Sequence, residues 1–214
     1  MKKKIMVVED HPIVRRGMVQ LINCEEDLII VGEADSISTA HEIIQETKPD
    51  LVLVDLSLKN SNGLELIKDL TYNCPKLLTI VVSLHNENVY AERVIRAGAK
   101  GYIMKSEATE NILTAIRLVL KGGIYLSTEM QRKMLNKIVS RQDNSVPEID
   151  HLSDREIEVF EMIGLGRSTK DIAKDLNLSI KTIETYKSHI KVKLNIKGST
   201  ELIQNATEWT INSR

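Results

Sequence analysis

Leu51-Val52-Leu53-Val54-Asp55 is the stretch that decides the fold, because four apolar residues run directly into a carboxylate. A short, continuous run of Val and Leu is typical of a strand that is buried on both faces of a sheet. Helix-like periodicities separate the strand-like runs, which occupy 4–8, 28–33, 50–54, 77–82 and 101–104. Five such units in succession predict an α/β fold with an open, doubly wound, five-stranded parallel sheet over residues 1–121.

Polar residues follow four of these five runs. Glu9 and Asp10 come after the first run, Asp55 after the third, Ser83 after the fourth and Lys105 after the fifth. The C-terminal ends of parallel strands share one edge of a sheet, and ligands bind outside that edge. We therefore expect these side chains to converge on one pocket. Three carboxylates, a hydroxyl and an ammonium group suit a divalent cation together with a phosphoryl group.

The residue types assign a role to each position. Glu9, Asp10 and Asp55 offer the oxygen ligands that Mg²⁺ prefers. Asp55, alone at the end of its strand, is the best candidate for a nucleophile that accepts a phosphoryl group as an acyl phosphate. Lys105 would pair with a phosphoryl oxygen, and Ser83 would donate a hydrogen bond to the same group. Each residue alone has a plainer reading as a helix cap or surface side chain, but four strand ends together argue against coincidence.

A second unit follows the predicted sheet. Residues 128–139 can form a helix and 142–147 have the composition of a polar linker, so 122–149 are expected to form a linker with a helix. Residues 150–214 have an all-helical pattern. Ser153 to Glu156 is a capping box, and the N-cap candidates of the next two helices are Ser168 and Ser179.

The predicted third helix of this unit is basic. The whole chain has 214 residues and a net charge of −1, yet residues 179–197 carry five lysines against one acid. A concentrated basic helix is the expected footprint of contact with a phosphate backbone. Ile183, Ile190 and Leu194 would form its buried stripe. Three short helices with a basic third helix fit a helix-turn-helix, and a helical protein-docking module is the competing interpretation.

The opposite face of that helix is expected to read DNA. Glu184, Thr185 and Ser188 face base edges in this interpretation, and a carboxylate can accept from a cytosine amino group. The lysines are better suited to hold phosphates. The predicted DNA-contacting residues are Lys181, Thr182, Glu184, Thr185, Lys187, Ser188 and Lys191.

The first unit resembles the receiver domain of bacterial two-component response regulators. The resemblance implies that Mg²⁺ is bound by Glu9, Asp10, Asp55 and the backbone carbonyl of Ser57, and that Asp55 is the phosphoacceptor. It also implies that Lys105 is the phosphate-binding lysine. Ser83 would be the switch hydroxyl and Tyr102 the rotating aromatic residue of the same set. Gly63 matches the glycine that follows the active-site loop. His85 occupies a position near the attacking water of dephosphorylation, although a plain loop histidine is an equal reading.

The second unit resembles the LuxR-type helix-turn-helix, in the segments 152–159, 172–179 and 181–185. Together the two resemblances indicate a response regulator of the NarL/FixJ type. They imply a partner histidine kinase, a homodimer when phosphorylated, and promoter DNA with two half-sites as the target. Many receivers carry proline after the lysine, where this chain has Ser106, which is also the expected cap of the fifth helix.

Two other classes of function compete. An Mg²⁺-dependent phosphohydrolase of the haloacid-dehalogenase type would carry a second aspartate where Ser57 stands, so turnover of an external substrate is not expected. A phosphorylation-independent DNA-binding regulator could use the receiver as a dimerisation platform. The two cysteines, Cys24 and Cys74, lack metal-ligand or redox spacing. The apolar run after Lys4 is too short for a signal peptide or a membrane span. We expect a cytoplasmic protein.

Overall fold

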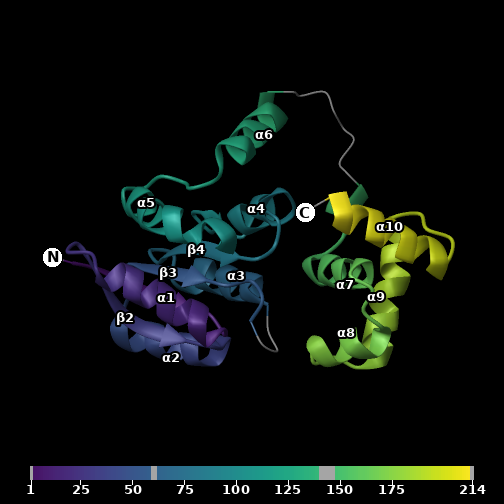
Figure 1. Cartoon of the computed structure of the whole chain (residues 1–214), viewed down its shortest axis with the longest axis horizontal. Coiled ribbons are helices and arrows are strands. Elements are labelled where there is room, and N and C mark those ends of the chain that lie inside the picture. Colours follow the sequence, from purple (N-terminus) through teal and green to yellow (C-terminus); the bar gives the residue numbers. More distant parts are fainter. Residues whose placement is uncertain (1, 59–61, 140–147, 213–214) are drawn as a thin grey trace. The chain divides into compact units, whose positions relative to one another are not determined.

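The computed structural model describes residues 2–58, 62–139 and 148–212. The chain forms two compact units, Met1–Asn136 and Lys137–Arg214 (Figure 1). The predicted polar linker at 142–147 lies outside the described residues. Among the residues that the structure describes, no helix is both long and apolar enough to cross a membrane.

The N-terminal unit is built on a five-stranded sheet in the order β2-β1-β3-β4-β5. Every neighbouring pair of strands is parallel, which confirms the predicted doubly wound sheet. The central strand β3 is buried along its whole length, as its apolar sequence requires. The strands are β1 (Lys3–Val8), β2 (Leu28–Ala34), β3 (Leu51–Val54), β4 (Leu78–Ser83) and β5 (Tyr102–Met104).

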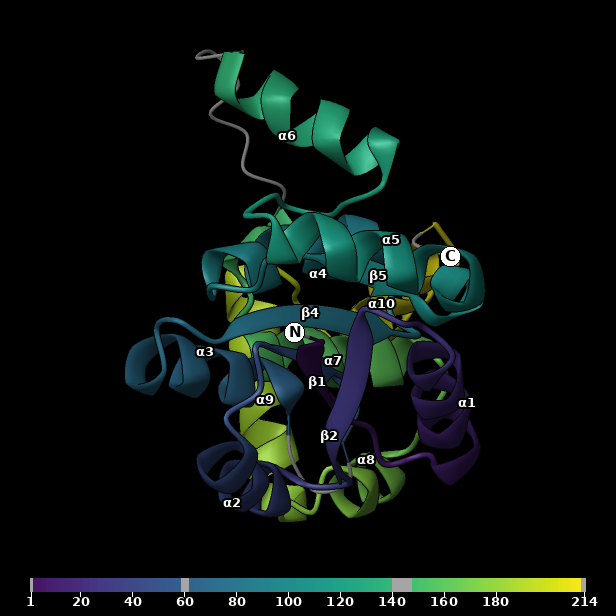
Figure 2. The ribbon, with the colours of Figure 1, turned by 90° about the vertical axis from the view of Figure 1, so that its left-hand side faces the viewer.

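Helices cover both faces of this sheet. Figure 2 shows α1 on one side of the strands and α2 and α3 on the other. Residues of α1 and α5 share one apolar core with inward-facing residues of the sheet, among them Met18, Ile22, Ile112 and Ile116. The helices are α1 (Pro12–Asn23), α2 (Ile37–Thr47), α3 (Gly63–Asn73), α4 (Glu87–Arg96) and α5 (Ala108–Leu120).

The start of α5 differs from the prediction that Ser106 caps it. Lys105–Glu107 form a 3₁₀ turn, and Glu107 is the N-cap residue without a side-chain cap hydrogen bond. The expectation was wrong because this turn takes up the residues after Lys105 before the α-helix begins. Lys105 is therefore the first residue after β5 and lies at the start of this turn.

The segment after α5 adds to the sheet. Tyr125 forms an isolated parallel bridge with Gly101, and its backbone carbonyl accepts a hydrogen bond from the Tyr102 N–H at 2.9 Å. The next helix, α6 (Thr128–Val139), is joined to α4 near its start, because the Ser127 N–H donates to Glu87 Oε1 at 2.8 Å. Residues of this segment thus belong to the packing of the N-terminal unit.

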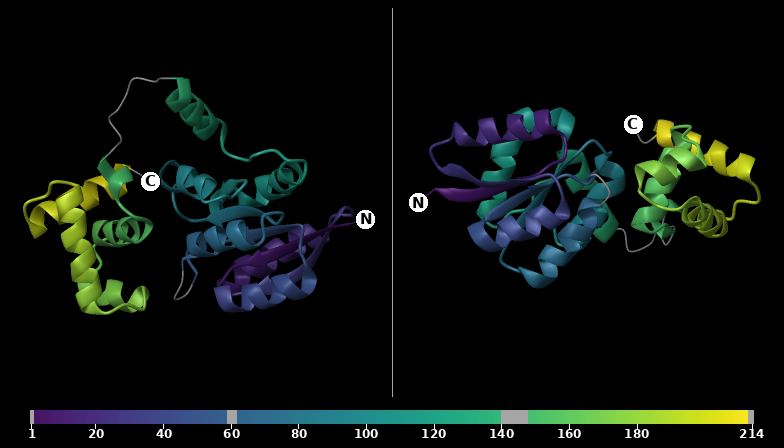
Figure 3. Two further views of the ribbon diagram at one scale, coloured as in Figure 1. Left: turned by 180° about the vertical axis from the view of Figure 1, so that it is seen from behind. Right: turned by 90° about the horizontal axis from the view of Figure 1, so that it is seen from below.

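The C-terminal unit is all helical, as predicted (Figure 3). Its predicted caps are present: Ser153 and Glu156 form a complete capping box, and Ser168 and Ser179 accept backbone hydrogen bonds at their helix starts. Its elements are the 3₁₀ turn η2 (Glu148–His151) and the helices α7 (Asp154–Gly164), α8 (Thr169–Asp175), α9 (Ile180–Lys193) and α10 (Ser199–Asn212).

The predicted apolar stripe of α9 is buried in part. Ile183 and Ile190 are fully buried, whereas Leu194, just after the helix, is half-buried. Glu156 ties α7 to α9, since its carboxylate accepts from the Ser153 N–H and from Lys193 Nζ, each at 2.6 Å. Burial raises the pKa of the Glu156 carboxyl, but the hydrogen bonds from these two partners together lower it by more. The net pKa of Glu156 is therefore below its ordinary value.

Candidate functional site

Asp55 lies at the centre of the site, directly after β3. Its backbone N–H donates to the Val8 carbonyl at 2.9 Å, which continues the pairing of β3 with β1 and fixes the carboxylate beside the end of β1. Glu9 and Asp10 follow β1 and are buried with it, at 0% and 7% exposure, and Asp55 is 2% exposed. The strand geometry therefore brings the three predicted carboxylates together.

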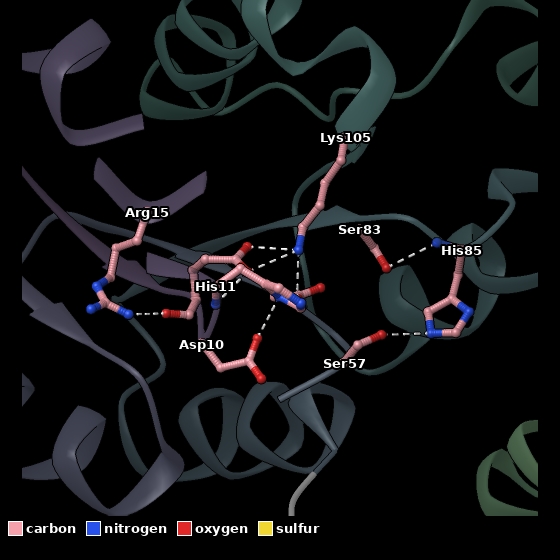
Figure 4. A network of polar contacts seen from close by, with 9 residues as sticks. Asp10, His11, Arg15, Ser57, Ser83, His85 and Lys105 are labelled. Atoms are coloured by element: carbon pink, nitrogen blue, oxygen red, sulfur yellow. Dashed lines mark hydrogen bonds and ion pairs between the residues drawn. The ribbon is translucent and has the colours of Figure 1, made fainter. Parts of the chain in front are cut away.

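Lys105 reaches across the sheet edge into this cluster (Figure 4). Its Nζ lies 2.8 Å from Asp55 Oδ2 and 2.7 Å from Glu9 Oε2. Burial lowers the pKa of the Lys105 ammonium, but the hydrogen bond and charge of Asp55, and then those of Glu9, raise it more, so the net pKa is above its ordinary value. The lysine is thus charged and offsets part of the repulsion between two buried carboxylates.

The carboxylates fit a hard cation. One ligand atom from each of Glu9, Asp10, His11 and Asp55 can be chosen so that all lie within 4.8 Å of one another. Asp55 Oδ1 is buried and has no hydrogen-bond partner among the residues that the structure describes. A buried, unpaired carboxylate oxygen is costly, and a cation with oxygen ligands would satisfy it.

His11 is a member of this cluster that the sequence reasoning missed. Its Nδ1 lies 2.7 Å from Asp10 Oδ1 and 3.1 Å from Glu9 Oε1 (Figure 4). Its position directly after the acidic pair was the available signal. Arg15 supports the same corner, because its Nη1 donates to the Glu9 carbonyl at 2.6 Å.

Gly63 explains how the chain leaves Asp55. A Cβ at this position would lie 2.0 Å from the Asp55 carbonyl oxygen and 2.9 Å from Leu56 Cα. Asn62 caps α3 by accepting from the Leu64 N–H at 2.9 Å, and the Gly63 N–H donates to the Leu56 carbonyl at 3.0 Å. The start of α3 therefore packs against the backbone of the phosphoacceptor candidate, and only glycine fits there without a backbone shift.

The predicted switch residues lie on the other side of the pocket, around His85. The Ser83 side chain is buried, and its Oγ accepts from the His85 N–H at 3.2 Å. Ser57 Oγ and His85 Nε2 are in hydrogen-bond contact at 2.9 Å (Figure 4). The rings of His85 and Tyr90 stack at a tilt, with centroids 4.6 Å apart. Ser57, Ser83 and His85 thus form one connected group beside Asp55.

Tyr102 already lies inward in this conformation. Its side chain is 1% exposed, and its hydroxyl donates to the His85 carbonyl at 2.7 Å. The sequence led us to expect this ring to turn inward in response to a phosphoryl group. The conformation described has the ring in that position and joined to the same loop that carries Ser83.

The predicted DNA-contacting residues gather on the exposed side of α9. The Thr185 and Ser188 hydroxyls donate to backbone carbonyls one turn earlier, at 3.0 and 2.9 Å. Glu184 and Lys187 form an ion pair at 2.9 Å, so this lysine is engaged within the protein. Thr182 follows the Ser179 cap and donates its N–H to that cap at the helix start. The side chain of Lys181 is exposed and that of Lys191 is half-buried.

Comparisons with known proteins agree with both units. A family model described as response regulator receiver domain matches residues 5–117, and one described as bacterial regulatory proteins, luxR family, matches residues 150–206. The oxygen regulatory protein NreC of Staphylococcus haemolyticus is 34% identical over 208 residues, covering 95% of this chain and 96% of that protein.

Solved structures of the RcsB response regulator of Salmonella typhimurium are also similar. One covers 97% of this chain and 98% of its own, with a TM-score of 0.69 and 26% identity. Another, bound to the rprA promoter in the presence of the phosphomimetic BeF3-, has a TM-score of 0.66 and 25% identity over 97% of this chain and 99% of its own. With a receiver sheet, a LuxR-type helical unit and these matches, the chain belongs to the NarL/FixJ-type response regulators, a family of transcription factors.

Proposed function

We propose that this response regulator is switched by transfer of a phosphoryl group from a partner histidine kinase to Asp55. One observation carries the proposal. Asp55 is buried with one oxygen, Oδ2, held by Lys105 at 2.8 Å and the other, Oδ1, without a hydrogen-bond partner in the described part of the chain. A carboxylate that is oriented by one oxygen and unpaired at the other is prepared to act as a nucleophile.

The transfer forms one bond and breaks one, and groups in the pocket stabilise the charge on the phosphoryl oxygens. A carboxylate oxygen of Asp55 attacks the phosphorus of the kinase phosphohistidine, a P–O bond forms, and the P–N bond breaks. The electron pair of that bond stays on the imidazole nitrogen. Lys105, already 2.8 Å from Asp55, stabilises negative charge on the phosphoryl oxygens. Bound Mg²⁺, held by Glu9, Asp10, Asp55 and the Ser57 carbonyl, would neutralise charge on the transferring group.

The same group of contacts would carry the signal outward. A phosphoryl oxygen on Asp55 would accept a hydrogen bond from the Ser83 hydroxyl, whose Oγ in turn accepts from the His85 N–H at 3.2 Å, so a shift of Ser83 toward the phosphoryl group would pull on the His85 backbone. His85 in turn holds Tyr102 and contacts Ser57, so a new position of Ser83 biases the loop that leads into α4. This is a two-state element set by local electrostatics.

The output would be binding to promoter DNA as a homodimer. Two copies of α9 would enter major grooves at half-sites about one helical turn apart, roughly 34–36 Å. Lys181 and Lys191 would neutralise phosphates, and Glu184 with Thr185 would face base edges.

Intact mass tests the chemistry directly. The chain is incubated with a small-molecule phosphodonor, with and without Mg²⁺, as wild type, Asp55→Asn and Asp35→Asn. Asp35 is the matched control, because it follows β2 at the same sheet edge but is exposed. We expect an Mg²⁺-dependent, alkali-labile phosphoryl adduct in wild type and Asp35→Asn and none in Asp55→Asn.

DNA binding is then compared between the two states. Tighter binding after phosphorylation, absent in Asp55→Asn, supports the switch. An adduct that appears equally in Asp55→Asn would overturn the assignment of the phosphoacceptor. DNA binding that is identical with and without phosphodonor would favour the phosphorylation-independent regulator.

A further inference from the structure

A closed triangle of polar contacts joins α8 to the exposed face of α9. Thr169 Oγ1 donates to Glu184 Oε1 at 3.1 Å, and Lys187 Nζ donates to Glu184 Oε1 at 2.9 Å and to Thr169 Oγ1 at 3.1 Å. Thr169 lies at the first position of α8, fifteen residues before Glu184. The two helices pack against each other in the C-terminal unit (Figure 1).

The contacts of the triangle leave Oε2 of the Glu184 carboxylate available. Both contacts go to Oε1 of Glu184, whose side chain remains 54% exposed. Lys187 is less accessible, with a side chain that is 20% exposed. Its hydrogen bond, with that of Thr169, lowers the pKa of Glu184, so the group is a carboxylate at neutral pH. An exposed carboxylate oxygen accepts hydrogen bonds and donates none.

An unpaired carboxylate would be unsuited to this face. DNA carries a dense row of phosphates, and a free negative charge on the reading helix would be repelled by them. The Lys187 ammonium at 2.9 Å cancels that charge locally. The same pairing occupies the ammonium, which makes Lys187 a poor candidate for a phosphate contact.

We propose that Thr169, Glu184 and Lys187 act as one base-reading unit in which Glu184 accepts from an exocyclic amino group in the major groove. Cytosine and adenine both present such a group there, whereas guanine and thymine present acceptors. Thr169 is the positioning residue: its hydroxyl fixes the Glu184 side chain in the direction of the groove before DNA arrives, so less side-chain freedom is lost on binding. The inference rests on sequence-specific DNA binding by α9.

Selection from a randomised duplex library tests base recognition by the full chain. The variants are Thr169→Val, Thr169→Ser, Glu184→Ala and Lys187→Met, each checked for folding by circular dichroism and Trp209 fluorescence. Wild type is expected to prefer cytosine or adenine at one position of each half-site. Glu184→Ala and Thr169→Val should each weaken the preference at that position by about fivefold to tenfold and leave the other positions unchanged. Thr169→Ser keeps the hydroxyl and should retain the preference.

A double variant separates positioning from plain support. If Thr169 acts through Glu184, Thr169→Val in the Glu184→Ala background should have little further effect on the preference. A Thr169→Val chain that binds all sequences more weakly, with every base preference intact, would show a phosphate or structural role and overturn the proposal. If wild type selects no motif at all, base recognition by α9 is wrong, and the proposed role of the triangle is overturned together with it.

Salt dependence tests the part assigned to Lys187. A lysine that neutralises one phosphate contributes about 0.9 to the slope of log affinity against log salt, and its replacement by methionine removes that contribution. We expect such a change for Lys181→Met and a clearly smaller one for Lys187→Met. Equal changes in the two variants would make Lys187 a phosphate contact and overturn its place in the reading unit.

Discussion

Replacing Lys105 with methionine will destabilise the receiver, because it leaves two buried carboxylates without their counter-charge. The side chain of Lys105 is 7% exposed, and those of Glu9 and Asp55 are 0% and 1% exposed. At contacts of 2.7 and 2.8 Å, each attraction is about 6 kcal/mol for an effective dielectric constant of roughly 20. Desolvation of the ions offsets much of this, and loss of one partner from a buried pair costs about 3–5 kcal/mol. We expect Lys105→Met to lose stability in that range without metal.

Urea unfolding can assign this loss to the receiver. Circular dichroism follows the whole chain, whereas the single tryptophan, Trp209, packs on Phe160 in the C-terminal unit with ring centroids 5.6 Å apart. Fluorescence of Trp209 therefore gives an internal reference that Lys105→Met should leave unchanged. Lys76→Met is the matched control, because Lys76 is exposed, and it should stay within about 0.5 kcal/mol of wild type.

A second substitution makes the electrostatic origin of the loss measurable. Adding Asp55→Asn to Lys105→Met removes one of the two facing carboxylates, so the double variant should recover part of the lost stability. If Lys105→Met unfolds within about 0.5 kcal/mol of wild type, the lysine is not holding the carboxylates together, and the electrostatic account of the pocket is refuted.

Cation binding, the tight approach at Gly63 and the buried Glu156 can each be tested by urea unfolding. Mg²⁺ at about one hundred times its Kd should stabilise the receiver by about 2.7 kcal/mol, and an unchanged unfolding midpoint would argue against the cation site. Gly63→Ala should lower the free energy of unfolding by about 1–3 kcal/mol, because its Cβ would lie 2.0 Å from the Asp55 carbonyl oxygen. Gly17→Ala has open space around its Cβ, so it should raise the free energy of unfolding by about 0.5–1 kcal/mol in the same urea assay. The lowered pKa of Glu156 means that its stabilising effect is complete above its ordinary value of 4.5 and is lost as pH falls through the folded-state pKa. Glu156→Gln should therefore weaken the C-terminal unit by about 1.5–3 kcal/mol at pH 7, and the difference from wild type in Trp209 fluorescence should shrink in acid.

The sheet and the pocket were predictable because strand ends are a local signal. An apolar run followed by Asp55 fixes both the strand and the position of the carboxylate, and parallel topology then brings Glu9 and Lys105 to the same edge. The capping box at Ser153 was predictable for the same reason, since both of its partners lie within four residues.

Contacts between elements were not predictable from such patterns. No periodicity indicates that Thr169 meets Glu184, because that contact depends on how α8 packs on α9. The turn after Lys105 replaced a plausible cap at Ser106, since a serine offers a cap but does not decide where the helix begins. The inward position of Tyr102 depends on the His85 carbonyl, which a loop seventeen residues earlier supplies.

The pairing of Tyr125 with the sheet has a consequence for where the N-terminal unit can be cut. β5 is the outer strand, and the Tyr102 N–H and the Lys100 carbonyl are both engaged by the Tyr125 backbone at 2.9 Å. Leu126 and Met130, which follow, are buried at 6% and 2% exposure. A protein truncated at Leu120 would open these backbone groups to strand addition by other chains and leave the apolar surface beneath Leu126 and Met130 uncovered. Truncation after α6 keeps the backbone pairing of Tyr125 and the burial of Leu126 and Met130, and gives a receiver that resists such association.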